Sequence, residues 1–318
     1  MNLKEIVKKI NETKSFAVVA HASPDGDAVG STLAMVLGLR NLGKKVTILS
    51  KEAPPEHLSY LSLYEEYGTV SSLLEENQVL LCLDCGNKDR LSMERDGFDE
   101  IFKVNIDHHV SNENYGELNY VDTTSASTAE IIFEILEALK VDLDEEMAKC
   151  LYTGIISDTG SFQYPSTTSK TLLIASKILE TGLDFSAIQR KLFSTTPFKR
   201  VKLLGRGLMT LESHLDGFVS TMYLEAEDFN TLAISDRDSG NIVNYGLEPE
   251  ECDVSILFKE AEGALRVSVR TKEHIDASAL CGKFGGGGHI RAAGCNMEGM
   301  SLPKAKQAFL DEIERMRA

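Results

Sequence analysis

The stretch Phe16-Ala-Val-Val-Ala20, followed by His21-Ala-Ser-Pro-Asp25-Gly-Asp27, decides the expected fold of this chain. Residues 16–20 form a short, continuously apolar run, which is typical of a strand buried on both faces of a parallel sheet. A helical pattern over Ala28–Leu42 follows, and Gly43 is a suitable C-terminal cap. A strand, a polar loop and a helix in this order predict the first unit of an α/β fold.

The same alternation continues through the first half of the chain. Apolar β-branched runs predict strands at Lys45–Leu49, Val79–Leu83 and Val104–Ile106. Helical patterns cover Ser125–Lys140 and Glu145–Ile156. We therefore predict an α/β N-terminal domain whose parallel sheet carries helices on both faces.

The second half has a different pattern. Consecutive helices over Leu183–Leu211, with Pro197 opening one of them, indicate a connector. Strand-like runs and a closing amphipathic helix then indicate a smaller α+β domain; they lie at Phe218–Leu224, Asp253–Phe258, Leu265–Val269 and Pro303–Arg317. The expected parts are a catalytic domain over residues 1–185, a helical connector over 186–213 and a substrate-binding domain over 214–318.

Composition and charge exclude several classes of protein. The 318 residues carry 33 Lys and Arg against 49 Asp and Glu, a net charge of −16. This balance argues against a protein that grips long nucleic acid through a basic surface, but it allows a small phosphate ligand at one site. Six irregularly spaced cysteines indicate buried, reduced thiols. No apolar stretch is long enough for a membrane span or a signal peptide, so a cytoplasmic location without membrane contact is expected.

Carboxylates and imidazoles follow several of the predicted elements at their carboxyl ends. The eight residues are His21, Asp25, Asp27, Asp84, Asp107, His108, His109 and Asp158. A single Asp in such a place is most often a turn former or a helix cap. The carboxyl ends of parallel strands meet at one edge, however, and five carboxylates in a partly buried cleft would repel one another. Bound divalent cations would neutralise the carboxylates and remove this repulsion.

The types of side chain narrow the choice of metal. Carboxylates and imidazoles without thiolates favour manganese, magnesium or iron over structural zinc. The number of ligands predicts two ions, and a pair of metals about 4 Å apart is the usual device for phosphoryl hydrolysis.

These groups, in order and spacing, resemble the four motifs of the DHH phosphoesterase superfamily. The sequence Gly285-Gly-Gly-Gly288-His289-x-x-Ala292-Ala293-Gly294 resembles the signature of the DHH-associated C-terminal domain. Within the superfamily the chain is similar to the nanoRNase group. This group degrades oligoribonucleotides of a few residues and removes the 3′-phosphate of phosphoadenosine phosphate. The resemblance implies the same short RNA and small-nucleotide substrates, without tracking along long nucleic acid.

The resemblance also implies roles for the clustered residues. Two manganese ions are expected, with magnesium or another divalent cation as the alternative. The expected ligands are His21 and Asp25 for the first ion, Asp27, His108 and Asp158 for the second, and Asp84 as a bridge between them. Asp107 would accept a hydrogen bond that orients an imidazole, and His109 would face the substrate phosphate. Catalysis would thus involve Asp84, Asp107, His108 and His109, with a metal-activated water attacking phosphorus in line.

Substrate contacts are expected in the second domain. Glycines let backbone N–H groups approach a phosphate closely, and His and Arg side chains add donors. The candidates are Gly286, Gly287, Gly288, His289, Arg270 and Arg291.

Several alternatives stay open at this point. A phosphodiesterase of the same fold acting on cyclic di-AMP or linear diadenylate is the main one, and a non-catalytic nucleotide-binding module is a remote one. Residues 124–128 have the composition of a helix N-cap, with a phosphate at that helix end as the alternative. Asn112 and Tyr115 are candidates for the pocket lining. The oligomeric state, a homodimer included, is also open.

Overall fold

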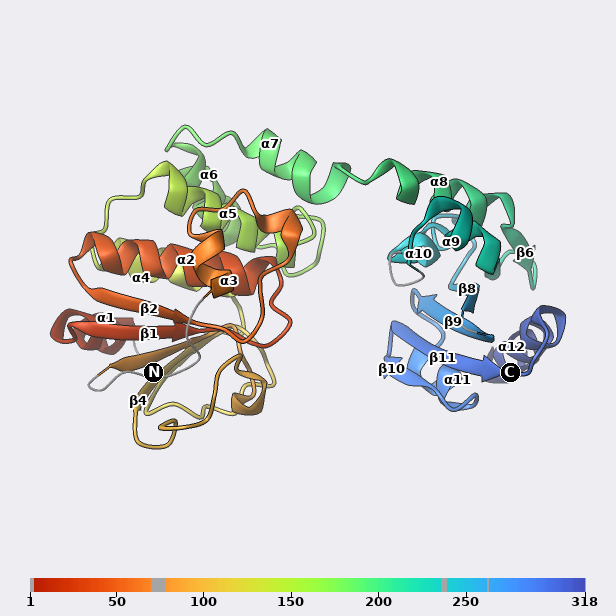
Figure 1. Cartoon of the computed structure of the whole chain (residues 1–318), viewed down its shortest axis with the longest axis horizontal. Helices are drawn as coiled ribbons and strands as arrows, with labels where there is room; N and C mark the ends of the chain where they lie inside the picture. Colours follow the sequence, from red (N-terminus) through yellow and green to blue (C-terminus); the bar gives the residue numbers. More distant parts are fainter. Residues whose placement is uncertain (1–2, 70–77, 236–238, 262, 318) are drawn as a thin grey trace. The chain divides into compact units, whose positions relative to one another are not determined.

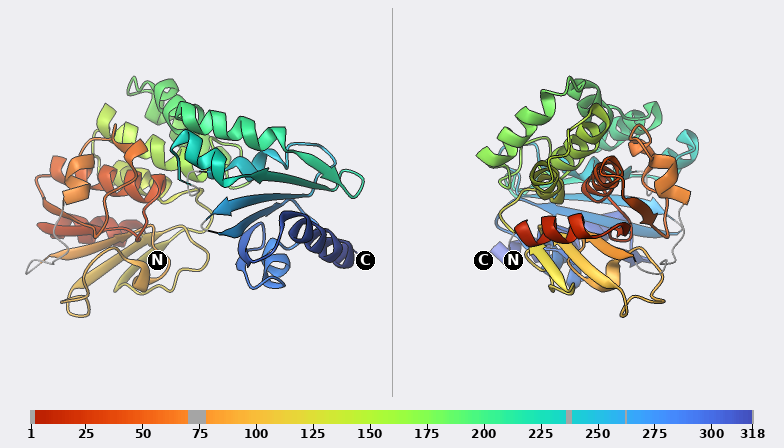
Figure 2. Two further views of the ribbon diagram at one scale, coloured as in Figure 1. Left: turned by 45° about the vertical axis from the view of Figure 1, so that its right-hand side comes forward. Right: turned by 90° about the vertical axis from the view of Figure 1, so that its left-hand side faces the viewer.

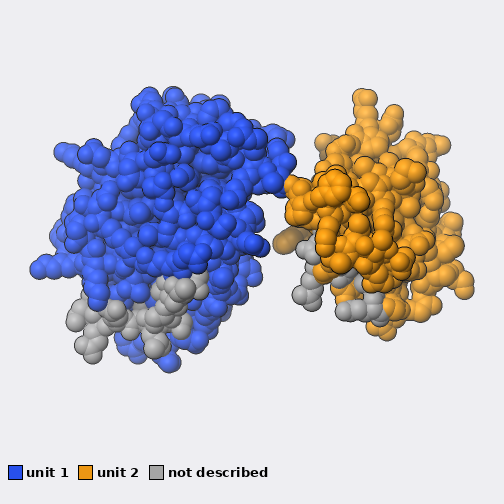
Figure 3. All heavy atoms as spheres, turned by 45° about the horizontal axis from the view of Figure 1, so that its top comes forward, with its two compact units in different colours: residues 1–195 blue, residues 196–318 orange. Residues whose placement is uncertain are grey.

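A computed structural model of the chain describes residues 3–69, 78–235, 239–261 and 263–317. The chain divides into two compact units, residues 1–195 and 196–318, and each is considered by itself (Figure 3). The stretch expected as a helical connector, residues 186–213, is divided between the two units.

The first unit is built on a five-stranded, entirely parallel sheet (Figure 1). Its strand order is β2-β1-β3-β4-β5, so the order reverses between β1 and β3. The strands are β1 (Ser15–Val19), β2 (Lys45–Leu49), β3 (Val79–Leu83), β4 (Phe102–Asp107) and β5 (Leu118–Val121). Every residue of β3 is buried, as its continuously apolar sequence predicts.

Helices cover one face of this sheet (Figure 2). Val18 and Leu81 of the sheet belong to the same apolar core as Leu33, Ile132 and Ile155 of the helices. The longer helices of the unit are α1 (Leu3–Glu12), α2 (Gly26–Asn41), α4 (Thr128–Ala138), α5 (Glu145–Asp158) and α6 (Ser169–Leu179). Shorter helical segments are η1 (Glu56–Leu58), α3 (Tyr64–Thr69), α7 (Phe185–Gln189) and η3 (Arg190–Ser194).

The other face packs against the connection between β3 and β4. Leu91, Met93 and Phe98 of this connection bury Val19 and Leu80 of the sheet. The α/β class and the parallel sheet are confirmed. The helical cover expected on this second face is reduced to one 3-10 turn, η2 (Lys88–Arg90), because a few apolar side chains of an irregular segment suffice to bury it.

The second unit holds a six-stranded mixed sheet of order β10-β11-β9-β8-β7-β6, in which only β7 and β8 pair in parallel. Its strands are β6 (Glu212–His214), β7 (Val219–Leu224), β8 (Val254–Ala261), β9 (Ala264–Thr271), β10 (Gly287–His289) and β11 (Ala292–Glu298). Its helices are α8 (Phe198–Met209), α9 (Ala226–Leu232), α10 (Ile242–Tyr245), α11 (Ala277–Gly282) and α12 (Leu302–Arg317). Pro197 directly precedes α8, as expected.

Strand β9 shows why this sheet has two different faces. Its burial alternates strictly, so Leu265, Val267 and Val269 point into the core below α11 and α12. Ser268 and Arg270 point to the opposite, more open face.

Candidate metal centre

The predicted site residues of the first unit gather at the carboxyl ends of its central strands. His21 follows β1, Asp84 follows β3, and Asp107 ends β4. Because the strand order reverses between β1 and β3, the loops after these two strands diverge to opposite faces and leave a crevice. The topology therefore explains why residues from distant parts of the sequence meet here.

His21, Asp25 and Asp84 form the first group, with one ligand atom of each within 4.8 Å of the others. His21 Nε2 lies 3.6 Å from Asp84 Oδ2 and 4.0 Å from Asp25 Oδ1. The other ring nitrogen, Nδ1, is 2.9 Å from the carbonyl of Ala22, which suits a proton on Nδ1 and a free lone pair on Nε2. Asp25 also caps α2, because its Oδ1 accepts from the N–H groups of Asp27 and Ala28.

Asp27, His108 and Asp158 form the second group. Asp27 is fully buried and lies at the N-terminus of α4, where Oδ2 accepts from Thr128 N at 2.6 Å and Oδ1 from Ala129 N at 2.9 Å. A helix N-terminus favours a negative charge, so α4 holds this carboxylate in place. Burial raises the pKa of Asp27 well above its ordinary value, and the carboxylates of Asp84 and Asp158 raise it further.

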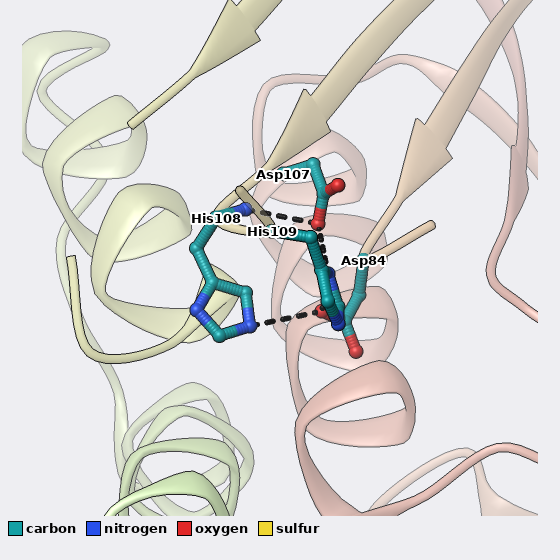
Figure 4. A group of neighbouring side chains, drawn as sticks. All are labelled: Asp84, Asp107, His108 and His109. Carbon is teal, nitrogen blue, oxygen red and sulfur yellow. Dashed lines mark hydrogen bonds and ion pairs between the residues drawn. The ribbon is translucent and has the colours of Figure 1, made fainter. Parts of the chain in front are cut away.

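Asp84 stands between the two groups and is 2 % exposed. Its backbone has a φ of +52°, a left-handed conformation that Asp tolerates better than most residues and that marks functional sites. Oδ1 accepts a hydrogen bond from Thr128 Oγ1 at 2.9 Å. The same oxygen lies 3.6 Å from His108 Nε2 and 3.7 Å from His109 Nδ1, as Figure 4 shows for the converging imidazoles.

His108 provides the test of whether these residues fit a cation. Its Nε2 is buried and faces Asp158 Oδ2 at 3.1 Å and Asp84 Oδ1 at 3.6 Å, yet it has no hydrogen-bond partner among the described residues. Burial opposes its protonation, but Asp158 and Asp84 raise the pKa of His108 to about 9. Without a cation these acidic groups must take up protons to coexist. The residues therefore fit divalent cations, which replace those protons.

The Asp107 carboxylate has a different position from the other acidic groups. It is fully buried, and Oδ1 accepts from His108 N at 2.9 Å and lies 2.7 Å from His109 Nδ1 (Figure 4). Asn112 Nδ2 donates to Oδ2 at 2.5 Å. Burial alone would raise the pKa of Asp107, but the hydrogen bonds from His109 and Asn112 lower it below its ordinary value.

The structure changes the interpretation of three sequence features near this site. Ser127 caps α4 as expected, but the N-terminal amides of Thr128 and Ala129 are occupied by Asp27, so that helix end offers no phosphate site. Asn112 donates to Asp107 Oδ2, a contact that the sequence did not predict. Tyr115 likewise donates its hydroxyl to the carbonyl of Cys85 at 2.9 Å.

The second half of the glycine run of the second unit lies in a strand. Gly287, Gly288 and His289 form the exposed edge strand β10, which pairs with β11. A side chain on Gly288 would come within 2.6 Å of the backbone at Ala292, so a glycine is required for this close pairing. Gly286 is likewise packed against Cys295, whereas the space beside Gly287 is open.

Arg270 and His289 are in register across this sheet. His289 pairs with Ala292, and Ala292 pairs with Arg270, so all three side chains point to the same open face. Arg270 is half-buried, burial lowers the pKa of its guanidinium, and it has no acidic partner among the described residues. Arg291 instead donates to the carbonyls of Glu273 and Ile275 through Nη1, so that part of its guanidinium is already used.

The sequence analysis did not predict the contact of Thr128 with Asp84, and it named Asn112 for the pocket lining but not as a partner of Asp107. Thr128 lies in a run of residues with the composition of a helix cap, and this composition alone does not indicate that its hydroxyl donates to Asp84. The one signal that could have revealed Asn112 is its position three residues after the Asp107-His108-His109 triplet, within reach of a turn.

The fold and the site define a two-domain α/β protein with two neighbouring groups of side chains that could hold cations at the switch point of a parallel sheet. Residues 15–155 match the DHH family, N-terminal domain, and residues 220–316 match the DHHA1 domain. The chain is 31% identical to the bifunctional oligoribonuclease and PAP phosphatase NrnA of Thermus thermophilus, over 93% of this chain and 88% of that protein. This chain therefore belongs to the DHH phosphoesterase family and carries its DHHA1 domain.

Other relatives agree with this placement. The enzyme of the same name from Bacillus subtilis is 27% identical over 92% of each chain. The cyclic-di-AMP phosphodiesterase PdeA of Listeria monocytogenes is 24% identical, but the match covers only 48% of that longer protein. Among solved structures, an exopolyphosphatase-related protein from Bacteroides fragilis superposes with a TM-score of 0.85 at 26% identity, over 99% of this chain and 97% of that one.

Proposed function

We propose that this protein is a metal-dependent phosphoesterase that hydrolyses short oligoribonucleotides and removes the 3′-phosphate of 3′-phosphoadenosine 5′-phosphate. The observation that carries the proposal is the pair of acidic groups at the carboxyl ends of the central strands: His21, Asp25 and Asp84 form one, and Asp27, His108 and Asp158 form the other. At neutral pH these carboxylates repel one another unless protons or cations neutralise them, and bound cations do so without taking up protons.

The choice of substrate is supported by the relatives. Those that match over nearly their full length are named as bifunctional oligoribonuclease and PAP phosphatase enzymes. The cyclic-di-AMP phosphodiesterase matches over less than half of its own length, so it supports the alternative substrate less well.

The metal is proposed to be a pair of manganese ions, with magnesium as the alternative. His21 and Asp25 would hold one ion, and the carboxylates and imidazole of Asp27, His108 and Asp158 the other. Asp84 would contribute to both, since His21 faces its Oδ2 and His108 faces its Oδ1. When bound, such ions neutralise charge on a phosphoryl group and make bound water acidic enough to act as a nucleophile.

The surrounding protein groups have their own tasks. Thr128 and the N-terminus of α4 keep Asp84 and Asp27 in place before any ion binds. His109 is 40 % exposed and is bonded through Nδ1 to Asp107, so its Nε2 is the ring atom available to a substrate phosphate. In the second unit, we propose that Arg270 and His289 bind a part of the substrate remote from the reacting phosphorus.

Charge limits the length of the substrate. With a net charge of −16, the protein repels a long polyanion at low salt, whereas a short one needs only local neutralisation. We therefore propose that efficiency falls as the RNA lengthens beyond a few nucleotides. Among the described residues, no helix has the length and apolar character needed to cross a membrane. The six cysteines are free and buried, which supports a reducing, cytoplasmic compartment.

A hydrolysis panel with manganese tests the proposal. The substrates are a dinucleotide, a five-residue RNA, a thirty-residue RNA, phosphoadenosine phosphate and cyclic di-AMP. We expect turnover of the short RNAs and of phosphoadenosine phosphate, and loss of all turnover in Asp84→Asn. Cyclic di-AMP as the best substrate would favour the alternative phosphodiesterase, and equal turnover of the five- and thirty-residue strands would contradict the length limit.

A further inference from the structure

The side chain of His109 is held by a partly buried chain of hydrogen bonds. Asp107 Oδ1 lies 2.7 Å from His109 Nδ1, and Asp107 Oδ2 accepts from Asn112 Nδ2 at 2.5 Å. Asn112 Oδ1 in turn accepts from Asn105 Nδ2 at 2.8 Å. Asn105 also donates to Asn119 Oδ1 at 3.1 Å, which connects strands β4 and β5 beneath the site.

This chain is anchored at its far end. Asn119 accepts from Gly116 N at 3.0 Å and donates to the carbonyl of Gly116 at 2.6 Å, so its amide cannot rotate freely. The order of donors and acceptors is thereby set from Asn119 towards His109. Asn105 is fully buried, where an unsatisfied amide would be costly.

The two oxygens of Asp107 therefore have different hydrogen-bond partners. Oδ1 bonds the His109 ring and the backbone N–H of His108, and Oδ2 accepts from Asn112. Rotation of the carboxylate would break these bonds together. His109 Nδ1 therefore keeps its proton, and Nε2 is kept as the atom that faces outward.

We propose that Asn112 is a positioning residue for His109: it locks the Asp107 carboxylate, which in turn fixes the tautomer and the direction of the His109 ring towards the substrate phosphate. The inference rests on the proposed phosphoesterase function and assigns no metal contact to Asn112. Outer partners of this kind commonly contribute about 10–100-fold to activity.

The variant Asn112→Leu removes the donor at similar size. We expect kcat/KM on a trinucleotide to fall by roughly 10–100-fold, with Mn²⁺ affinity in calorimetry unchanged within about threefold. In a His109→Ala background the same substitution should lower kcat/KM by less than about twofold, because its effect on the reaction depends on His109. Equal losses in both backgrounds would overturn the proposal.

Tyr115→Phe is the matched control. It removes a partly buried hydrogen bond close by, from the hydroxyl to the carbonyl of Cys85, which Asn112 Nδ2 also reaches at 3.4 Å, but it leaves the hydrogen bond from Asn112 to Asp107 in place. Tyr115→Phe should keep kcat/KM near the wild-type value. The loss of kcat/KM caused by His109→Ala should be as large in this variant as in the wild type. If Asn112→Leu folds poorly, Asn112→Ser replaces it, since serine is polar but too short to reach Asp107.

A second measurement does not depend on activity. ¹⁵N NMR of the imidazoles should show His109 with its proton on Nδ1 in the wild type and a mixture of tautomers in the Asn112 variants. An unchanged tautomer would overturn the positioning role. Absence of any phosphoesterase activity in the wild type would instead reject the proposed function, while the tautomer measurement still tests the role of Asn112.

Discussion

The hydroxyl of Thr128 donates to Asp84 Oδ1 at 2.9 Å, and the N–H of the same residue donates to Asp27 Oδ2 at 2.6 Å. One buried residue at the start of α4 thus holds two carboxylates that come from different loops. Carboxylates oriented in this way lose less freedom when a cation binds.

This contact predicts a role for Thr128 in metal affinity. Thr128→Val keeps the size and the backbone bond to Asp27 but removes the hydroxyl, so Mn²⁺ affinity should fall by roughly 10–100-fold in calorimetry. Thr128→Ser keeps the hydroxyl and should bind within a few-fold of wild type. Wild-type affinity in the valine variant would contradict this role.

Asp84 is predicted to be indispensable for turnover. Asp84→Asn is preferred to alanine because asparagine tolerates the left-handed backbone at this position. Loss of one transition-state contact typically costs about 10²–10³-fold, and loss of a residue shared by both ligand groups should cost at least as much. The metal-free variant should melt no lower than wild type, since a buried repelling charge is gone. A tenth of wild-type activity in Asp84→Asn would rule out the shared-ligand assignment.

Chelation is predicted to abolish activity without unfolding the protein. The ligand groups lie at the edge of a large apolar core that exists without them. Far-ultraviolet circular dichroism should persist in EDTA, and Mn²⁺ at a hundredfold excess over Kd should restore about 2.7 kcal/mol of stability. Loss of the dichroism signal on chelation would indicate a structural metal instead.

Arg270 and His289 are predicted to act in substrate recognition. They belong to the second unit, whereas all the clustered ligands belong to the first. Remote contacts help only substrates large enough to reach them. The double variant Arg270→Ala, His289→Ala should therefore lower efficiency on a trinucleotide by roughly 10–10³-fold, from two lost charge-assisted contacts. A small chromogenic phosphodiester should be hydrolysed almost as fast as by wild type.

The control for this prediction is Lys283→Ala, which removes an exposed cationic side chain paired with Glu312 in the same unit. It should leave both substrates unaffected. Equal losses on both substrates in the double variant would show that the second unit helps to form the catalytic centre itself.

Asp122 is predicted to make stability depend on pH in the acid range. Burial opposes its ionisation, but hydrogen bonds from Thr124 and Ser125 and the charge of Lys170 lower its pKa from 3.8 to about 2. Because the folded-state pKa is the lower one, this stabilisation is complete above about pH 4 and is lost as the pH falls towards about 2.

Urea unfolding of the metal-free protein measures the contribution of Asp122 to stability. The free energy of unfolding of Asp122→Asn should be below that of the wild type at about pH 7, and this difference, the gap, should be smaller at about pH 3. Asp142→Asn, at an exposed position, is the control and should show no such gap. A gap that stays constant with pH would mean that the carboxylate charge is not responsible.

Much of the first unit could be predicted because buried parallel strands leave a strong signal. The runs at Phe16–Ala20, Lys45–Leu49 and Val79–Leu83 correspond to β1, β2 and β3. Strand β5 and helix α6 were not predicted. β5 has only four residues, each partly exposed, so its sequence has no continuous apolar run.

The hydrophobic pattern and the order of the chain are enough to identify the residues at the ends of the strands. The sequence thereby indicated the clustered carboxylates and imidazoles, and the glycine-rich segment of the second unit. How these groups are held became visible in the folded chain: Asp27 on the N-terminus of α4, Asp84 by Thr128, and His109 through Asp107 and Asn112. The fold also shows that Gly287 and Gly288 form an edge strand. These contacts join segments that are distant along the chain, and local pattern records burial and spacing but not which distant partner a polar atom meets.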